Sequence, residues 1–367
     1  MSSLQKEIDD MRKEIRTDGY SMSIGEWISL YENNEIDIHP EFQRFFRWTP
    51  QQKSNFIESL LLGIPVPPIF VSQRKDGVWD VIDGLQRLST IYQFVGILKD
   101  ENNNNIAPLV LEPTRYLPSL KGKKWNDPDD SENSFTMEQR LLIKRAKISA
   151  RIILRESDER AKYDLFQRIN TGGSQLTPQE VRNCILVMIN KYFYSWLRTL
   201  ANYEPFQECI ALSDKNLIEQ YDMELALRFI VFVNQQLETF EHNRDIGEYL
   251  TDAMIQLASE ESFDKNEVES KFKGTFDVLA ACLGSNSFRR WDGSKNKFLG
   301  GFLLSPYEVV AFGIGYNYPN IPSPELIEEK IKNLYSDETY RKWSGSGVRA
   351  NSRIPNLLPL GRELFKA

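Results

Sequence analysis

The sequence predicts an α+β protein with a small sheet in its N-terminal unit, followed by an all-helical C-terminal unit. Asp76-Gly77 separates two β-rich runs, which is a strong hairpin signal. A strand near residues 148–154 is expected in the same sheet. From about Gln179 onward, apolar residues recur at three- and four-residue spacing, as in packed helices. We expect the units to span residues 1–157 and 158–367.

Composition narrows the class of protein. The chain has 367 residues, of which 41% are hydrophobic, enough for a substantial core, and its formal net charge is −7. A protein with a net negative charge is not expected to bind nucleic acid over its whole surface, although this charge is compatible with a local basic face that does. Cys184, Cys209 and Cys282 are far apart and are expected to be reduced. Without a signal pattern or membrane-length apolar run, we expect a soluble, cytoplasmic protein with no membrane contact.

Start and stop signals place the helices of the N-terminal unit. A helix is expected over about Ser23–Tyr31, and another from Thr49 as N-cap with Pro50 in its first turn, ending at Gly63. After the hairpin, a third helix is expected to start near Leu88. Residues 102–105 and 113–134 are expected to be an exposed loop and a long surface excursion, and residues 137–144 a helix.

The second half contains two further features. A helix over about 158–169 is expected to exit sharply at 170–173, and Thr177, Pro178 and Glu180 predict the next helix through a capping box. The aromatic residues of the helical unit are assigned to its core, among them Trp196, Phe229, Phe232 and Phe240. The segment 341–353 is expected to be a Gly/Ser/Arg-rich loop, whose Arg349 and Arg353 could also contact a phosphate or nucleic-acid backbone.

The residue types and motifs present argue against several kinds of active site. His39 and His242 are the only histidines and lie far apart in the sequence, which argues against a histidine-metal nuclease, a zinc hydrolase and a serine-histidine triad. No GxxxxGK[ST] loop is present, so a Walker-type ATPase is excluded. The remaining candidate is a site in which arginine and carboxamide side chains bind or cleave a phosphate ester.

The segment VIDGLQRLSTIYQFV, residues 81–95, is the most informative part of the chain. Its pattern predicts a strand, a tight turn at Asp83-Gly84 and the start of a helix. A helix N-terminus that carries an arginine favours the binding of an anion. Asp83 is either a helix cap or a carboxylate that holds magnesium or orients water. Gln86 and Arg87 are either exposed first-turn residues or, as we favour, phosphate contacts.

Two other polar clusters accompany this turn. Gln43, Arg44, Arg47 and Trp48 form either a surface cation–π and ion-pair patch or part of the site. Arg168, Asn170 and Thr171 are either helix-end caps or part of the site, together with the adjacent Gly172 and Gly173.

These clusters, in this order, resemble the domain-of-unknown-function 262 family and the N-terminal part of GmrSD-type restriction enzymes. The matching motifs are FQRFFRW, ESLLLGIPVPPIF, DGLQRLST and LFQRINTGGSQLTPQEVR, in the span 39–184. The resemblance implies a ParB/sulfiredoxin-like fold with a small mixed sheet and nucleotide hydrolysis centred on the DGQQR motif. In this chain Leu85 replaces the first glutamine of that motif.

The expected function is an NTP-binding, NTP-hydrolysing regulatory module of a bacterial antiphage or restriction system. Mg²⁺ is the expected cofactor, held by Asp83, and a separately encoded effector such as a nuclease is the expected partner. The expected catalytic residues are Asp83, Gln86 and Arg87. The expected nucleotide-binding residues are Gln43, Arg44, Arg47, Gly84, Arg168, Asn170, Thr171, Gly172 and Gly173.

Two other functions are alternatives to this expectation. Whichever function applies, DNA is a further candidate partner and the protein could form homo-oligomers. A non-catalytic DNA sensor or scaffold would use Arg44, Arg47 and the C-terminal loop on DNA phosphates, with Leu85 as a mark of lost catalysis. Such binding should weaken steeply as salt rises, unlike binding at a buried nucleotide site. The third reading is a complete nuclease with an unrecognised metal site.

Overall fold

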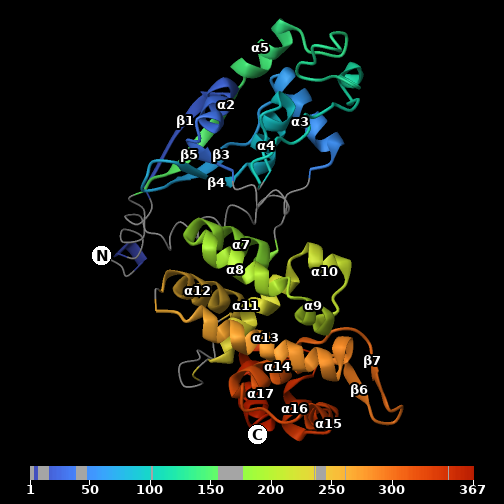
Figure 1. Ribbon diagram of the computed structural model, residues 1–367. Coiled ribbons are helices and arrows are strands. Elements are labelled where there is room, and N and C mark those ends of the chain that lie inside the picture. The colour runs from blue at the N-terminus through green and yellow to red at the C-terminus, as the bar shows by residue number, and fades with distance from the viewer. Residues whose placement is uncertain are drawn as a thin grey trace. The chain divides into compact units, whose positions relative to one another are not determined.

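The computed structural model describes residues 4–6, 16–38, 48–100, 102–155, 177–234, 236, 245–260, 262–345 and 347–367. The chain divides into two compact units, 1–176 and 177–367, which are coloured from blue to green and from green to red in Figure 1. The mixed α+β class is confirmed. In the part of the chain that is described, no helix has the length and apolarity needed to cross a membrane.

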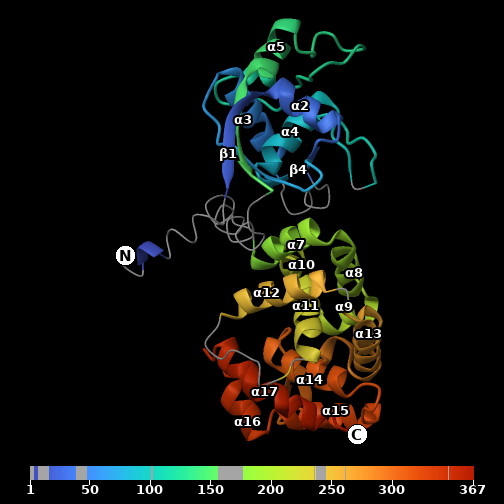
Figure 2. The same cartoon turned by 90° about the vertical axis from the view of Figure 1, so that its left-hand side faces the viewer.

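The N-terminal unit is built on a mixed five-stranded sheet in the order β1-β5-β3-β4-β2 (Figures 1 and 2). The pairs β1–β5 and β3–β4 are antiparallel, and β3–β5 and β2–β4 are parallel. The strands are β1 (Thr17–Ser23), β2 (Ile36–Asp37), β3 (Ile69–Gln73), β4 (Trp79–Asp83) and β5 (Lys147–Ile153). The helices are α2 (Ile24–Glu32), α3 (Pro50–Leu61), α4 (Leu85–Val95), the 3₁₀ turn η2 (Pro118–Leu120) and α5 (Met137–Arg145).

Most elements of this unit follow the sequence signals. Ser23 and Thr49 cap α2 and α3 through capping boxes, and Gly77 takes a positive φ of 91° in the β3–β4 hairpin. Strand β5 lies in the hairpin's sheet, as predicted. Strand β1 was not predicted, because its residues are mostly exposed and polar and give no apolar alternation. Helix α4 begins at Leu85, three residues earlier than expected.

The surface excursion 113–134 is tied to α3 by one buried carboxylate. Glu58 is 6% exposed and its Oε1 accepts hydrogen bonds from the Thr114 hydroxyl and from the Tyr116 and Leu117 N–H groups, the latter two at 2.9 Å. Burial raises the pKa of Glu58, but these three hydrogen bonds outweigh it and hold the pKa below its usual value. The ionised carboxylate therefore stabilises the excursion.

We expect Glu58→Gln to lower the stability of the N-terminal unit by about 2 kcal/mol at pH 7, because neutral acceptors form weaker hydrogen bonds. A lowered carboxyl pKa stabilises above the unfolded value of about 4.3 and loses that effect as pH falls through the folded value. The difference between variant and wild type should therefore shrink below about pH 4. Urea unfolding at several pH values measures it, with the exposed Glu132→Gln as control. A pH-independent difference would contradict the ionic role.

The C-terminal unit is mostly helical, with one short hairpin. Its first helices are α7 (Pro178–Ile189), α8 (Lys191–Ala201), α9 (Glu204–Ile210), α10 (Asp214–Ile218), α11 (Tyr221–Val233), α12 (Ile246–Ser259) and α13 (Lys265–Cys282). Then follow η4 (Gly284–Asn286), β6 (Arg290–Asp292), β7 (Lys297–Leu299), α14 (Leu304–Asn317), α15 (Pro324–Leu334), α16 (Glu338–Trp343) and α17 (Ala350–Leu364). The β6–β7 hairpin corrects the all-helical prediction, since strands of three residues are too short to give a periodic pattern.

The side chains of this unit mostly meet the expectations. Phe229 and Phe232 are fully buried, whereas Trp196 is only half-buried and donates its indole N–H to Glu269 at 2.9 Å. All three cysteines are free thiols; Cys184 and Cys209 are buried and Cys282 is half-buried. Phe240 and both histidines lie outside the described residues.

The Gly/Ser/Arg-rich tail differs most from its prediction. Helix α16 ends at Trp343 and α17 begins at Ala350, so Arg353 is helical rather than part of a loop. Its guanidinium donates to both carboxylate oxygens of Glu308, at 2.6 and 2.9 Å. This pairing engages the Arg353 guanidinium, which was also considered for a contact with a phosphate or nucleic-acid backbone. Arg349 is the N-cap residue of α17.

Glu308 belongs to a chain of buried ion pairs that joins α7, α11, α14 and α17. Arg182 pairs with Glu224 at 2.6 Å, Glu224 pairs with Arg228 at 2.8 Å, and Arg228 lies 3.6 Å from Glu308. Burial lowers the pKa of Arg228, but the charges of Glu224 and Glu308 outweigh it and leave the pKa raised. We call these residues and Arg353 the buried ionic network.

Candidate functional site

The predicted turn lies where β4 ends and α4 begins. Asp83 is the last residue of β4, and Gly84 is the N-cap residue of α4 with a φ of 102°. A side chain at Gly84 would be strained at this φ, and its Cβ would lie 2.3 Å from Ile69 Cδ1 and 3.1 Å from Arg87 Nη2. Ile69 is fully buried, so its side chain would have to shift within the core. The tight approach of strand, turn and helix therefore requires glycine here.

We expect Gly84→Ala to destabilise the N-terminal unit by roughly 3 kcal/mol, through backbone strain and overpacking together. Gly63→Ala is the matched control, because Gly63 also has a positive φ, 68°, but nothing lies within 4 Å of its added Cβ. The control should lose only about 1 kcal/mol from strain. Urea unfolding compares them, and equal losses would contradict the steric argument.

The mostly buried Arg87 side chain connects two parts of this turn through hydrogen bonds. Its Nη2 donates to Asp83 Oδ2 at 2.6 Å, and its Nη1 donates to the Pro67 carbonyl at 2.8 Å. The Arg87 side chain is 10% exposed and that of Asp83 is 36% exposed. The guanidinium therefore holds the Asp83 carboxylate in place at the surface and links the proline-rich segment before β3 to the helix start. Arg87 was expected to contact phosphate, and that role stays a prediction beside these two internal hydrogen bonds.

Gln86 brings two of the sequence motifs together. Its side-chain oxygen accepts the backbone N–H of Trp48 at 3.0 Å, and the Trp48 ring packs edge-to-face on Phe56 with centroids 5.5 Å apart. Trp48 is the last residue of the FQRFFRW motif, so that motif ends directly on the first turn of α4. Thr90 also donates to the Gln86 carbonyl at 2.6 Å.

The start of α4 differs from those of several other helices. Helices α2, α3, α5 and α7 all begin with a serine or threonine capping box, whereas the N-cap Gly84 of α4 provides no side-chain acceptor. The first N–H groups of a helix have no intrahelical partner and carry its positive dipole end. The Asp83–Arg87 turn can therefore present backbone donors to an anion.

The other predicted site residues cannot be placed beside this turn. Gln43, Arg44 and Arg47 lie in residues 39–47, outside the described residues, and so do Arg168, Asn170, Thr171, Gly172 and Gly173, in residues 156–176. Their roles remain predictions. Leu85 is 6% exposed and packs in the core, where the family motif has a glutamine.

The predicted Mg²⁺ has one described carboxylate at the turn. Asp83 Oδ2 is occupied by the Arg87 cation, so only the other oxygen suits a metal ion. Within the described ranges, no group of three or more histidine, cysteine or acidic residues could hold a metal. These residues fit an ion carried mainly by substrate phosphates, as Mg²⁺ often is, rather than a cage made by the protein.

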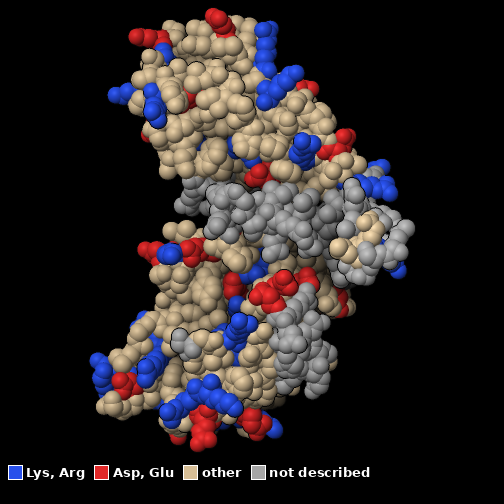
Figure 3. All heavy atoms as spheres, turned by 180° about the vertical axis from the view of Figure 1, so that it is seen from behind, with Lys and Arg blue, Asp and Glu red and all other residues tan. Residues whose placement is uncertain are grey.

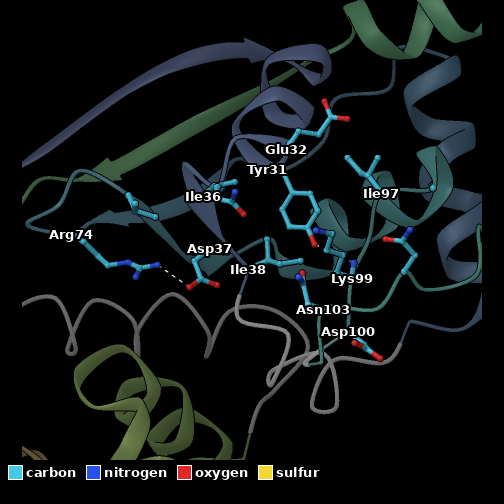
Figure 4. A pocket seen from close by; sticks show the side chains of 14 residues that line it. Tyr31, Glu32, Ile36, Asp37, Ile38, Arg74, Ile97, Lys99, Asp100 and Asn103 are labelled. Carbon is cyan, nitrogen blue, oxygen red and sulfur yellow. Dashed lines mark hydrogen bonds and ion pairs between the residues drawn. The ribbon is translucent and has the colours of Figure 1, made fainter.

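A separate pocket of about 580 Å³ lies beside β2 and the loop after α4 (Figure 4). Its lining combines carboxylates, amides, two cations and the Tyr31 ring. Asp37 pairs with Arg74 at 2.8 Å, and the Tyr31 hydroxyl accepts a hydrogen bond from the backbone N–H of Lys99 at 3.2 Å. Burial raises the pKa of Tyr31. Among the described residues that line it, none belongs to the Asp83–Arg87 turn, and they come from segments whose sequences carry no motif.

The fold and the turn define an α+β protein in which a strand, a D-G turn and a helix start carry a paired acid and arginine. Residues 24–187 match the family model described as the GmrSD restriction endonuclease, N-terminal domain. This part of the chain is therefore related to the N-terminal part of GmrSD-type restriction enzymes, which confirms the resemblance, and the protein is a component of a restriction or antiphage system. No curated protein and no solved structure matches the chain.

Proposed function

We propose that this protein binds and hydrolyses a nucleoside triphosphate at the Asp83–Arg87 turn and thereby regulates a separately encoded effector. The observation that carries the proposal is the fixed Asp83 carboxylate beside the uncapped start of α4. Backbone N–H groups can receive phosphate oxygens, while a carboxylate held in one orientation can position water. The match to a restriction-enzyme domain supports a role in a restriction or antiphage system.

In this proposal each residue has a distinct task. Asp83 orients the attacking water or a phosphate-borne Mg²⁺, which supplies charge neutralisation when bound. Arg87 fixes Asp83, and Gln86 fixes the end of the segment that carries Arg44 and Arg47, which would neutralise phosphate charge. Residues 168–173 would close the site. The alternative role of Gln86 in orienting water is weaker, because its oxygen already accepts the Trp48 N–H.

The test is phosphate release by the full-length protein from ATP, GTP, CTP and UTP with magnesium, with and without DNA. We expect turnover of at least one nucleotide and a loss of roughly 100-fold in Asp83→Asn, the size of a lost catalytic base. Asp76→Asn, at the far hairpin turn, is the control. If no nucleotide is hydrolysed, and none raises the melting temperature, the proposal fails.

A non-catalytic DNA sensor is the second candidate, and one observation favours it. Arg87 and Gln86 both serve internal contacts, so the turn could be retained for its structure alone. In that case nucleotides would have no effect, and DNA affinity would fall steeply with salt.

A further inference from the structure

The β6–β7 hairpin forms a short ribbon at the edge of the C-terminal unit (Figure 1). Its strands pair antiparallel, with Arg290 opposite Leu299, Trp291 opposite Phe298, and Asp292 opposite Lys297. The turn between them, residues 293–296, is exposed. The ribbon therefore presents a two-stranded surface to solvent.

One face of the ribbon is anchored to α15. The Trp291 and Phe298 rings lie 4.9 Å apart, and Lys332 of α15 lies 4.9 Å from the centroid of the Trp291 ring. At the base, the Tyr335 hydroxyl donates to the Arg289 carbonyl at 2.7 Å. Because side chains alternate along a strand, Arg290 and Lys297 lie on the other face, and Asp292 lies there too, directly opposite Lys297. Packing thus fixes the ribbon and leaves two cations and one carboxylate on its free face.

The ribbon is basic in an acidic protein. Residues 289–301 contain four basic residues and one acidic residue, while the whole chain has a net charge of −7. Figure 3 shows Lys and Arg side chains at the lower end of this unit, with Asp and Glu side chains among them. Asp292 accepts from the Ser294 hydroxyl at 2.6 Å and lies 3.7 Å from Lys295 Nζ. Glu328, on α15, pairs with Lys332 at 2.6 Å. These carboxylates shape the turn and anchor the base.

The cations and the glycines of the ribbon lie at the surface. Arg290, Lys295 and Lys297 are exposed, and Gly300 and Gly301 are exposed with nothing within 4 Å of an added Cβ. Bare glycine backbone lets a phosphate approach N–H groups closely. The ribbon thus combines exposed cations with exposed glycine backbone on a packed support.

We propose that the β6–β7 ribbon binds the phosphate backbone of duplex DNA, with Arg290, Lys295 and Lys297 as its contacts. A two-stranded ribbon fits the major groove, where cations on its free face and tip reach the flanking phosphates. This surface is distinct from the Asp83–Arg87 turn and does not depend on nucleotide chemistry there. It also differs from the C-terminal segment 341–353, where Arg353 lies in α17 and is paired with Glu308.

The test is fluorescence anisotropy of a labelled 30-base-pair duplex with the full-length protein between 50 and 200 mM salt. The triple variant R290A/K295A/K297A should bind roughly 100-fold more weakly at low salt, and its log–log salt slope should fall by about 3, near one per lost phosphate contact. Phosphate release without DNA should be unchanged, which separates this proposal from the nucleotide site.

The matched control is K75A/K121A/K215A, which removes the same charge from exposed lysines elsewhere. It should retain wild-type affinity and slope. Equal losses in both triple variants would mean that net charge alone matters and would overturn the assignment. So would absence of duplex binding by the wild type, or binding of single-stranded RNA only. Thermal melts of both variants verify that the unit is folded.

Discussion

Glu308→Ala is expected to destabilise the C-terminal unit by about 3–5 kcal/mol, the usual cost of breaking a buried ion pair. Glu308 is 1% exposed, receives two hydrogen bonds from Arg353 and lies 3.6 Å from Arg228. Its loss would leave both guanidinium groups in the interior without this counter-charge. The cost is therefore mostly the penalty of unpaired buried charge rather than the strength of the original contact.

Hydrogen exchange of peptides from α14 and α17 measures this effect within one unit of the full-length chain. Glu329→Ala, on the exposed face of α15, is the control and should change stability by less than about 0.5 kcal/mol. Protection factors in α14 that match those of the control would show that the buried ionic network is not needed for stability. Unchanged exchange in β3 and β4 would confine the effect to the C-terminal unit.

The elements that could be predicted from the sequence are those with local signals. Thr49, Thr136 and Thr177 each cap a helix through contacts three residues away, and Asp76-Gly77 closes a two-strand turn. Such contacts lie within a few residues in the chain, so they are visible in the sequence. Strand β1 is defined by pairing with β5, more than 100 residues away, and no local pattern marks it.

The buried ionic network shows the same limit for side chains. Arg353 and Glu308 are 45 residues apart, and Arg182 and Glu224 are 42 apart. Composition therefore indicated a flexible tail, although Arg353 holds one helix against another. A charged residue within a glycine- and serine-rich segment gives no sign of burial until its partner is known.

The candidate site was only partly predictable for a related reason. Asp83, Gly84, Gln86 and Arg87 are contiguous, so a strand–turn–helix pattern located them together. The direction of the Arg87 side chain is set by the Pro67 carbonyl, 20 residues earlier, which no local pattern reveals. The sequence predicted which residues gather at the turn, and the structure adds which of them act on one another.

Arg87→Ala is accordingly expected to lower stability and turnover together. Removing the guanidinium leaves the Pro67 carbonyl and the Asp83 carboxylate without their donors, at a cost of about 3 kcal/mol to the N-terminal unit. Arg87→Lys should recover little of this, because one ammonium cannot replace a planar fork that bonds two acceptors at once. In a double-mutant cycle with Asp83→Ala, we expect a coupling of about 2 kcal/mol in stability.

Kinetics separate a positioning role from a phosphate contact. If Arg87 acts by holding Asp83, the Lys variant should lose roughly 100-fold in kcat with little change in KM, since misplacing one group by about 1 Å has that effect. A guanidinium that binds phosphate in the ground state would instead raise KM when replaced. A higher KM at unchanged kcat would therefore contradict the positioning role, and would return Arg87 to the direct phosphate contact that the sequence first indicated.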